Sequence, residues 1–313
     1  MTPGPYSLDD DSSDAETSEA RRRRYQRRRL TAGAAVLLLV VWVASLLSSG
    51  GSGKPHAATR STATVSSAAL LAAQRSLQAQ AAERARESQA IQSALSYTAY
   101  VTVAGAAERE MALTFDDGPG PFTPQVLTTL RRLHTPATFF LVGRSIKDFG
   151  AYVTTELADG FALGDHTQDH PPMATLSRQD QVRQLLDQAK GAAAYGAPFP
   201  QLFRPPYGSF NATTLSIAKK LKMLTILWTI DTADFRQPGV DVIVRSVIGG
   251  ARPGAIVLMH DAGGARAQTI AALPRIVKGL HRRGYTLVTV PRLLADNPPV
   301  SSQEVPPAGL SGG

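Results

Sequence analysis

The chain has 313 residues, of which 43% are hydrophobic, enough to bury one large core or two modest ones. It contains no cysteine, which excludes disulfides, thiolate metal sites and cysteine nucleophiles. The formal net charge of +8 would suit a nucleic-acid binder, but seven of the 33 basic residues lie within residues 21–29, so we expect no nucleic-acid partner.

The first 47 residues predict a membrane anchor. Residues 1–29 begin with an acidic stretch and end in the arginine cluster, and we expect a disordered cytoplasmic tail. Residues 30–47 are an uncharged run of 18 residues, about the minimum that spans a bilayer. Because arginine is enriched on cytoplasmic flanks, everything after residue 48 is predicted to lie outside the cytoplasm. The alternative is a cleaved signal peptide and a secreted protein, but no clear Ala-x-Ala cleavage site follows the run.

Residues 48–105 predict a linker followed by a stalk. The segment 48–60 is rich in Gly, Ser and Ala, which is typical of flexible linkers. Residues 68–95 favour a helix, but its apolar face is thin, which indicates a spacer rather than a domain. A weak coiled-coil partner for this helix is the alternative. At the far end, residues 297–313 contain four prolines and three glycines and predict a disordered tail.

Residues 106–296 alternate short apolar runs with helical patterns, which predicts an α/β domain with a parallel sheet. The predicted strands are 111–115, 138–142, 161–164, 202–204, 224–230, 255–259 and 286–290. The predicted helices are 124–133, 148–159, 178–195, 211–222, 240–249 and 268–283. Seven strands can close into a barrel or form an open doubly wound sheet, and the strand count leaves both alternatives open.

Reactive side chains follow five of these strands. They are Asp116 and Asp117, Asp165 and His166, Arg204 and Tyr207, Asp231 and Asp234, and His260 and Asp261. Because the carboxyl ends of parallel strands share one face of the sheet, we expect these residues to converge on a single site.

One carboxylate and two imidazoles among them suit a catalytic metal. Asp117, His166 and His170 would be three ligands that leave room for water and substrate, as in hydrolytic zinc sites. The neighbouring Asp116 points elsewhere, since successive side chains diverge along an extended backbone. It is therefore the candidate general base, which takes a proton from the attacking water.

His260 is the candidate general acid, which donates a proton to the departing amine. Asp231 is expected to hydrogen-bond the His260 imidazole and favour its charged form. Arg204 would orient Asp116 and favour its ionised state. The backbone N–H of Tyr207, in a Pro-Pro-Tyr-Gly turn, would face the developing oxyanion.

These motifs resemble the polysaccharide deacetylase family, also called the NodB-homology or carbohydrate esterase family 4 group. The matching segments are TFDDGP at 114–119, ATFFLVG at 137–143, HTQDHP at 166–171, RPPYG at 204–208, DTAD at 231–234 and LMHD at 258–261. The resemblance implies a distorted (β/α) barrel, zinc or another divalent ion such as cobalt, and an acetylated polysaccharide as substrate. It implies that Asp116 is the base and His260 the acid, and that Arg204 and Asp231 tune them. The metal ligands that it implies are Asp117, His166 and His170. Phe235 departs from the tryptophan that many relatives carry beside the acetyl pocket.

Three alternatives compete with this interpretation. Another metal-dependent C–N hydrolase can use the same scaffold, because a fold does not fix its substrate. A catalytically idle wall-binding protein would be expected to lack Asp116 or His260. A nonhaem iron oxygenase also uses two histidines and a carboxylate, but its site does not call for Asp116 and His260.

Overall fold

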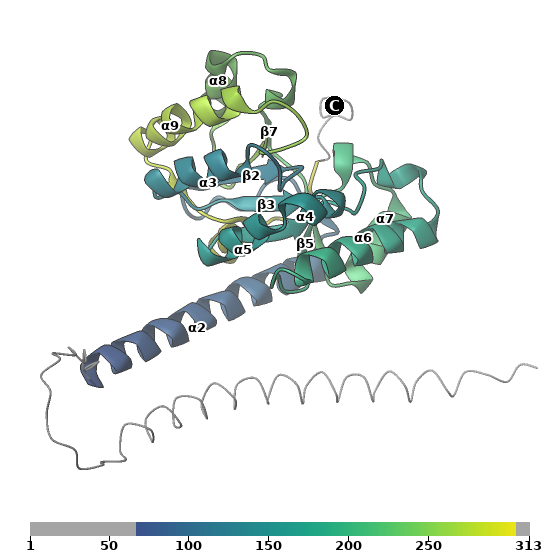
Figure 1. Ribbon diagram of the computed structural model, residues 1–313, viewed down its shortest axis with the longest axis horizontal. Coiled ribbons are helices and arrows are strands. Elements are labelled where there is room, and N and C mark those ends of the chain that lie inside the picture. The colour runs from purple at the N-terminus through teal and green to yellow at the C-terminus, as the bar shows by residue number, and fades with distance from the viewer. Residues whose placement is uncertain (1–66, 305–313) are drawn as a thin grey trace, which may run out of the picture. The chain divides into compact units, whose positions relative to one another are not determined.

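The computed structural model describes residues 67–304 and begins with a long helix, α2 (Ser67–Tyr97), followed by a parallel α/β unit (Figure 1). Within these residues no helix combines the length and apolarity that crossing a bilayer requires. The predicted span at residues 30–47 lies outside the described part of the chain, as do the cytoplasmic tail and the linker.

The described residues contain nine strands in one sheet, and every ladder between them is parallel. The strands are β1 (Tyr100–Val101), β2 (Glu110–Asp116), β3 (Thr138–Leu141), β4 (Ala162–Asp165), β5 (Leu202–Phe203), β6 (Leu224–Ile226), β7 (Ile230–Asp231), β8 (Ile256–His260) and β9 (Thr286–Leu287). Their order is β1-β6-β5-β4-β3-β2-β8-β7, with β9 beside β2. The predicted parallel α/β class is confirmed.

One stretch of chain brings the two ends of this sheet together. The single strand predicted at 224–230 is two strands, because β6 pairs with β5 whereas β7 pairs with β8. Between them the backbone changes partners: Leu227 N donates to Val101 O at 2.8 Å, and Thr229 N donates to Ile256 O at 2.8 Å. The sheet is therefore a curled half-barrel, which is consistent with the expected distorted (β/α) barrel.

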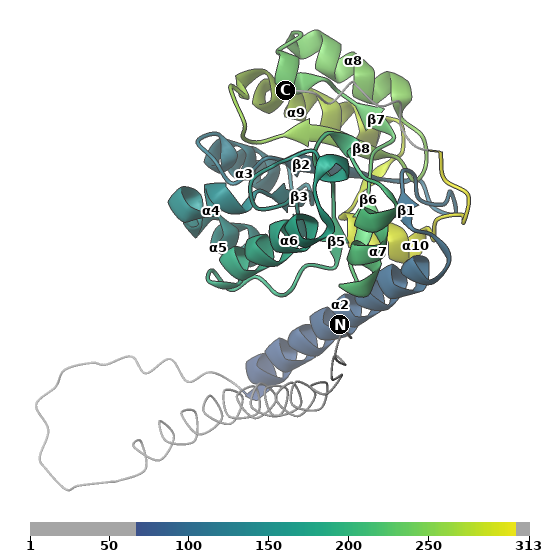
Figure 2. The same cartoon turned by 90° about the vertical axis from the view of Figure 1, so that its right-hand side faces the viewer.

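Helices cover the outside of the curled sheet (Figure 2). They are α3 (Thr123–Arg132), α4 (Gly143–Phe149), α5 (Ala151–Ala158), α6 (Arg178–Ala193), α7 (Ala212–Lys220), α8 (Val240–Gly250) and α9 (Ala267–Arg282). The short helix α10 (Val290–Asp296) instead packs in one cluster with Ala112 and Ile256, on the other face of the sheet. Three of the helices begin at capping residues: Ser177 accepts from Asp180 N at α6, Asn211 forms a capping box with Thr214 at α7, and Thr289 accepts from Arg292 N at α10. Three short 3₁₀ turns, η1 (Met173–Thr175), η2 (Pro206–Gly208) and η3 (Asp234–Arg236), lie in the connections.

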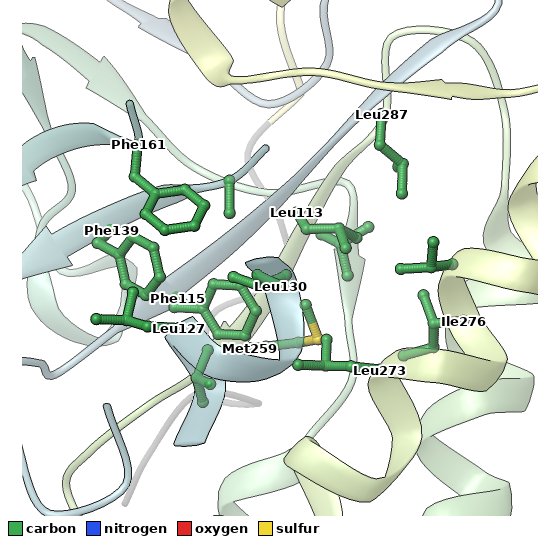
Figure 3. Packing of buried hydrophobic residues seen from close by; sticks show 14 of the residues in the cluster. Leu113, Phe115, Leu127, Leu130, Phe139, Phe161, Met259, Leu273, Ile276 and Leu287 are labelled. Atoms are coloured by element: carbon green, nitrogen blue, oxygen red, sulfur yellow. The ribbon is translucent and has the colours of Figure 1, made fainter. Parts of the chain in front are cut away.

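The alternation of side chains along β2 decides what faces the interior of the barrel. Met111, Leu113 and Phe115 belong to the large core between the sheet and the helices, where Figure 3 shows Phe115 beside Phe139 and Met259. Since successive strand residues point to opposite faces, Ala112, Thr114 and Asp116 face the other way. Asp116 thus reaches the interior because of its place in the β2 pattern.

The folded unit extends beyond the predicted limits of 106–296 at both ends. The last turns of α2 bury Ile91 and Leu95 in one cluster with Leu293 of α10, whereas Leu77, nearer the start of α2, is 66% exposed. Part of the predicted stalk is therefore packed on the sheet unit.

The first residues of the predicted C-terminal tail are also attached to the unit. Gln303 Oε1 accepts from Thr102 N at 2.9 Å, and Tyr100 OH donates to Gln303 O at 2.8 Å. Residues 305–313 lie outside the described residues.

Candidate active site

A cleft of about 360 Å³ opens at the carboxyl ends of the strands. Six of the predicted site residues line it: Asp116, Asp117, His166, His170, Tyr207 and His260. The expected convergence of residues from distant motifs is thus present in the structure. Arg204 lies behind this surface, fully buried, and contacts the cleft through Asp116.

The three predicted metal ligands lie together. Asp117 Oδ1 is 3.1 Å from His170 Nε2 and 3.7 Å from His166 Nε2. One ligand atom from each residue lies within 4.8 Å of the other two. Donors bound to one tetrahedral zinc ion at ~2.0–2.1 Å are about 3.3 Å apart, so these separations bracket the required value.

The other ring nitrogen of each histidine is already engaged. His166 Nδ1 donates to the backbone carbonyl of Arg204 at 2.6 Å, which leaves Nε2 with a free lone pair. His170 Nδ1 lies 3.0 Å from the Tyr207 hydroxyl, so a proton on Nδ1 again leaves Nε2 to bind a cation. Sequence reasoning considered only the backbone of Tyr207 and missed this role of its side chain.

The protonation states of the cluster also suit a cation. Burial lowers the pKa of His166 to about 4, although Asp116 and Asp117 oppose this shift, so the imidazole is neutral at pH 7. Burial alone would raise the pKa of Asp117, but the adjacent imidazole of His170, with those of His260 and His166, holds it well below its usual value. A neutral imidazole and a charged carboxylate are the forms that bind metals.

The surroundings of Asp117 leave room for an ion. Its Oδ1 is buried and accepts no hydrogen bond from the described residues, which is costly unless a cation satisfies it. A Cβ on Gly263 would lie 2.3 Å from Asp117 Oδ2, so only glycine allows the loop after β8 to approach so closely. Asp117 and His170 both adopt left-handed backbone conformations, φ 73° and 61°, which aim their side chains at the cluster. The donor set therefore fits a divalent metal.

Arg204 positions the candidate base from inside the barrel. Its Nη1 donates to Asp116 Oδ1 and to Thr114 Oγ1, each at 2.7 Å. Its Nε and Nη2 donate to the carbonyls of Ile226 and Leu227 at 3.1 Å, and its Cζ lies 4.1 Å from the centre of the Phe140 ring. Asp116 Oδ2 remains directed at the metal cluster, 3.6 Å from His166 Nε2. The predicted contact between Arg204 and Asp116 is confirmed.

The partner of His260 differs from the prediction. His260 Nδ1 lies 2.7 Å from Asp234 Oδ1, and Asp234 Oδ2 accepts from the His260 backbone N–H at 2.9 Å. Asp231 instead caps its own turn, because its Oδ1 accepts from Ala233 N at 2.8 Å and Ala233 has a φ of 48°. The expected hydrogen bond from Asp231 to His260 is therefore wrong, and the second aspartate of the DTAD motif takes that place.

This pairing sets the charge of the candidate acid. Burial alone would lower the pKa of His260, but the charge and hydrogen bond of Asp234 outweigh burial and raise it to about 9. His260 is thus protonated at pH 7 and can give up a proton. The ring of Phe235 stands edge-on to it, with ring centres 5.6 Å apart, so Phe235 lines the cleft beside the acid.

The known proteins to which this chain is similar include deacetylases of polysaccharides or their oligomers. The sequence model described as polysaccharide deacetylase matches residues 104–226. A chitooligosaccharide deacetylase of Sinorhizobium fredii is 35% identical over 63% of this chain and 98% of its own length. A peptidoglycan-N-acetylglucosamine deacetylase of Bacillus cereus is 40% identical over 60% of this chain and 89% of its own. A solved peptidoglycan N-acetylglucosamine deacetylase, bound to an N-hydroxybenzamide, superposes with a TM-score of 0.61 at 31% identity, covering 63% of this chain and 92% of that one.

Proposed function

Because the chain belongs to the polysaccharide deacetylase family and is a hydrolase of N-acetyl bonds, we propose that it deacetylates a glycan such as peptidoglycan or a chitin-like polymer with the help of a divalent metal. The observation that carries this proposal is the grouping of Asp117, His166 and His170 in one cleft with a member of each of two charged pairs. One pair is Asp116 with Arg204 and the other is His260 with Asp234. A base and an acid thus line the same cleft as one candidate metal site.

Asp117, His166 and His170 would hold the ion, for which zinc is the first candidate and cobalt the second. When bound, such an ion polarises the acetyl carbonyl and makes water acidic enough to lose a proton near pH 7. The proton transfers are carried out by side chains of this protein.

Asp116 takes a proton from the attacking water as a new bond forms to the acetyl carbonyl carbon. Arg204 keeps the base in place, since it anchors one carboxylate oxygen and leaves the other free. The Tyr207 backbone N–H, in its left-handed turn beside the cleft, is proposed to stabilise the oxyanion. His260 then donates its proton to the glycan nitrogen, the C–N bond breaks, and acetate and a free amine leave.

Asp231, which was proposed to act through His260, now has a different proposed role. It lies at the end of β7, where its carboxylate fixes the turn that carries Asp234 into η3. Asp231 is therefore a positioning residue of the acid, acting through the backbone.

Two alternatives make different predictions. A catalytically idle wall-binding protein does not require an acid with a raised pKa, whereas His260 has one. Another C–N hydrolase on this scaffold would release no acetate from a polymer. We retain the glycan deacetylase because the base, the acid and the three ligands are all present in one cleft.

The test is acetate release by the full chain loaded with zinc or cobalt, on peptidoglycan, chitin oligomers and acetylxylan. We expect release from at least one N-acetylated polymer, and loss of release on chelation with recovery when zinc is returned. Asp116→Asn should lower kcat by roughly 10²–10⁴-fold while zinc binding, measured by calorimetry, persists. A matched control is Arg275→Gln, which removes an exposed partner of Asp241, and neither residue lines the cleft. Full activity in Asp116→Asn would refute the mechanism.

A further inference from the structure

A buried arginine of the cleft has no acidic partner. Arg266 is 2% exposed and lines the cleft, yet no carboxylate among residues 67–304 lies within 4.0 Å of it. Its Nε donates to Ala262 O at 2.7 Å and its Nη1 to Ala265 O at 3.1 Å. These two bonds fix the plane of the guanidinium, and they leave Nη2 without a hydrogen bond inside the described structure.

Such a group calls for an anion from outside the chain. A buried charge is costly unless it is paired and hydrogen-bonded, and backbone carbonyls supply only part of what a guanidinium needs. The carboxylates of the cleft are already committed, because Asp116 is bound by Arg204 and Asp117 faces the two histidines. The mechanism proposed above also assigns no proton transfer to Arg266.

A second arginine also lines the cleft. Arg144, at the start of α4, lines the cleft and is exposed, and it forms no ion pair within the described part of the chain. It follows β3, whereas Arg266 follows β8, and these are two of the three strands that pair with β2. The two arginines therefore come from the loops on either side of Asp117. The lining contributed by Pro205, Trp228 and Phe235 carries no charge.

Because two arginines without an acidic partner among the described residues line this cleft, we infer that Arg266, assisted by Arg144, binds a carboxylate of the substrate. Guanidinium groups bind carboxylates through two parallel hydrogen bonds, and one whose plane is already fixed loses little entropy on binding. The preferred substrate is then an anionic N-acetylated glycan, and neutral chitin-like oligomers are poorer ones. The inference rests on the proposed function and specifies its substrate class. The carboxylate can belong to a sugar of the glycan or to a peptide attached to it.

The experiment compares three substrates of matched length. They are a neutral N-acetylglucosamine oligomer, a peptide-free glycan strand whose alternate sugars bear a lactyl carboxylate, and the same strand with its peptides. For the parent chain we expect kcat/KM to be higher on the carboxylate-bearing strands, with an advantage that shrinks as salt is added. An advantage on both strands assigns the carboxylate to the sugar, and one confined to the peptide-bearing strand assigns it to the peptide.

Two substitutions test the arginines themselves. Arg266→Met should reduce the ratio of anionic to neutral kcat/KM by roughly 10- to 100-fold, the usual effect of losing a hydrogen bond to a charged group. Arg266→Lys keeps the charge but not the planar fork, so its ratio should lie between those of the parent and Arg266→Met. Arg144→Gln, at an exposed position, should reduce the ratio only about two- to fivefold. Arg275→Gln is the control for loss of one positive charge.

Binding is measured separately by calorimetry on the Asp116→Asn chain, so the inference is tested even without turnover. Equal affinity for neutral and anionic strands would overturn the inference. An equal loss of affinity for both strands in Arg266→Met would also overturn it, because it would show that Arg266 binds only the acetate that is released. If melting shows that Arg266→Met does not fold, Arg144→Gln and the salt dependence decide. Turnover of the neutral oligomer alone would overturn this inference and leave the deacetylase function intact. Absence of any acetate release would instead count against the proposed function.

Discussion

The Asp234–His260 pair should set the alkaline limit of activity. His260 must be protonated to act as an acid, and its raised pKa of about 9 keeps it so at neutral pH. The rate should therefore fall as the pH rises through the pKa of His260. That limit lies at or below 9, because a bound cation offsets the contributions of Asp117 and Asp116.

Replacing Asp234 with Asn keeps the shape of the pair but removes its negative charge. We expect Asp234→Asn to shift the alkaline limit of kcat to lower pH by about one to two units, with a smaller loss near pH 6. Full pH profiles of the parent and the variant measure this shift. Asp241→Asn, which changes an exposed carboxylate paired with Arg275, is the control. An unchanged limit in Asp234→Asn would contradict the role of Asp234.

At this scale the sequence predicted most of the site but not all of its contacts. Asp116, Asp117, His166, His170 and His260 follow strands whose common direction forces them together, so strand assignment was sufficient. The choice between Asp231 and Asp234 depends on a turn with a left-handed alanine, for which residue type gives no signal. Only the path of the backbone could decide it.

Among the elements, the end of α2 should contribute to stability and its beginning should not. Ile91 is 2% exposed and packs in the cluster shared with α10, whereas Leu77 on the same helix is 66% exposed. Ile91→Ala should lower the free energy of unfolding by about 2–5 kcal/mol. Leu77→Ala, the matched control, should change it by less than about 0.5 kcal/mol. Denaturant unfolding of the two variants measures both values. Equally small changes in the free energy of unfolding would show that no part of α2 packs on the sheet unit.

The sequence located the long elements better than the short ones. The helices at 178–195 and 268–283 were predicted within a few residues of α6 and α9, because their apolar periodicity extends over four turns. The short strand β1 and the helix α10 were missed, since two or seven residues are too few to show a period. The packing of α2 was missed for another reason, because only its last turns carry buried apolar side chains.

For the whole molecule, the arginine cluster at residues 21–29 leads us to propose an N-terminus inside the cell and a catalytic unit outside it. In intact cells, added protease should remove a tag placed at the C-terminus and spare one placed at the N-terminus. Lysed cells, in which both tags are cut, are the control. The opposite pattern would refute this orientation. Protein that accumulates in the medium without its N-terminal tag would instead establish a cleaved signal peptide.

The position of Arg204 ties the shape of the barrel to its chemistry. The same guanidinium holds the carbonyls of Ile226 and Leu227, where the chain leaves β6 for β7, and the carboxylate of Asp116. We call this segment, where the chain passes from β6 to β7, the seam of the barrel. If the seam opens, the guanidinium loses two of its hydrogen bonds and no longer holds the Asp116 carboxylate in place. A molecule in which the seam opens locally is therefore inactive until it closes again, although most of its sheet is intact. Tight closure of the seam is in this sense a condition of turnover as well as of stability.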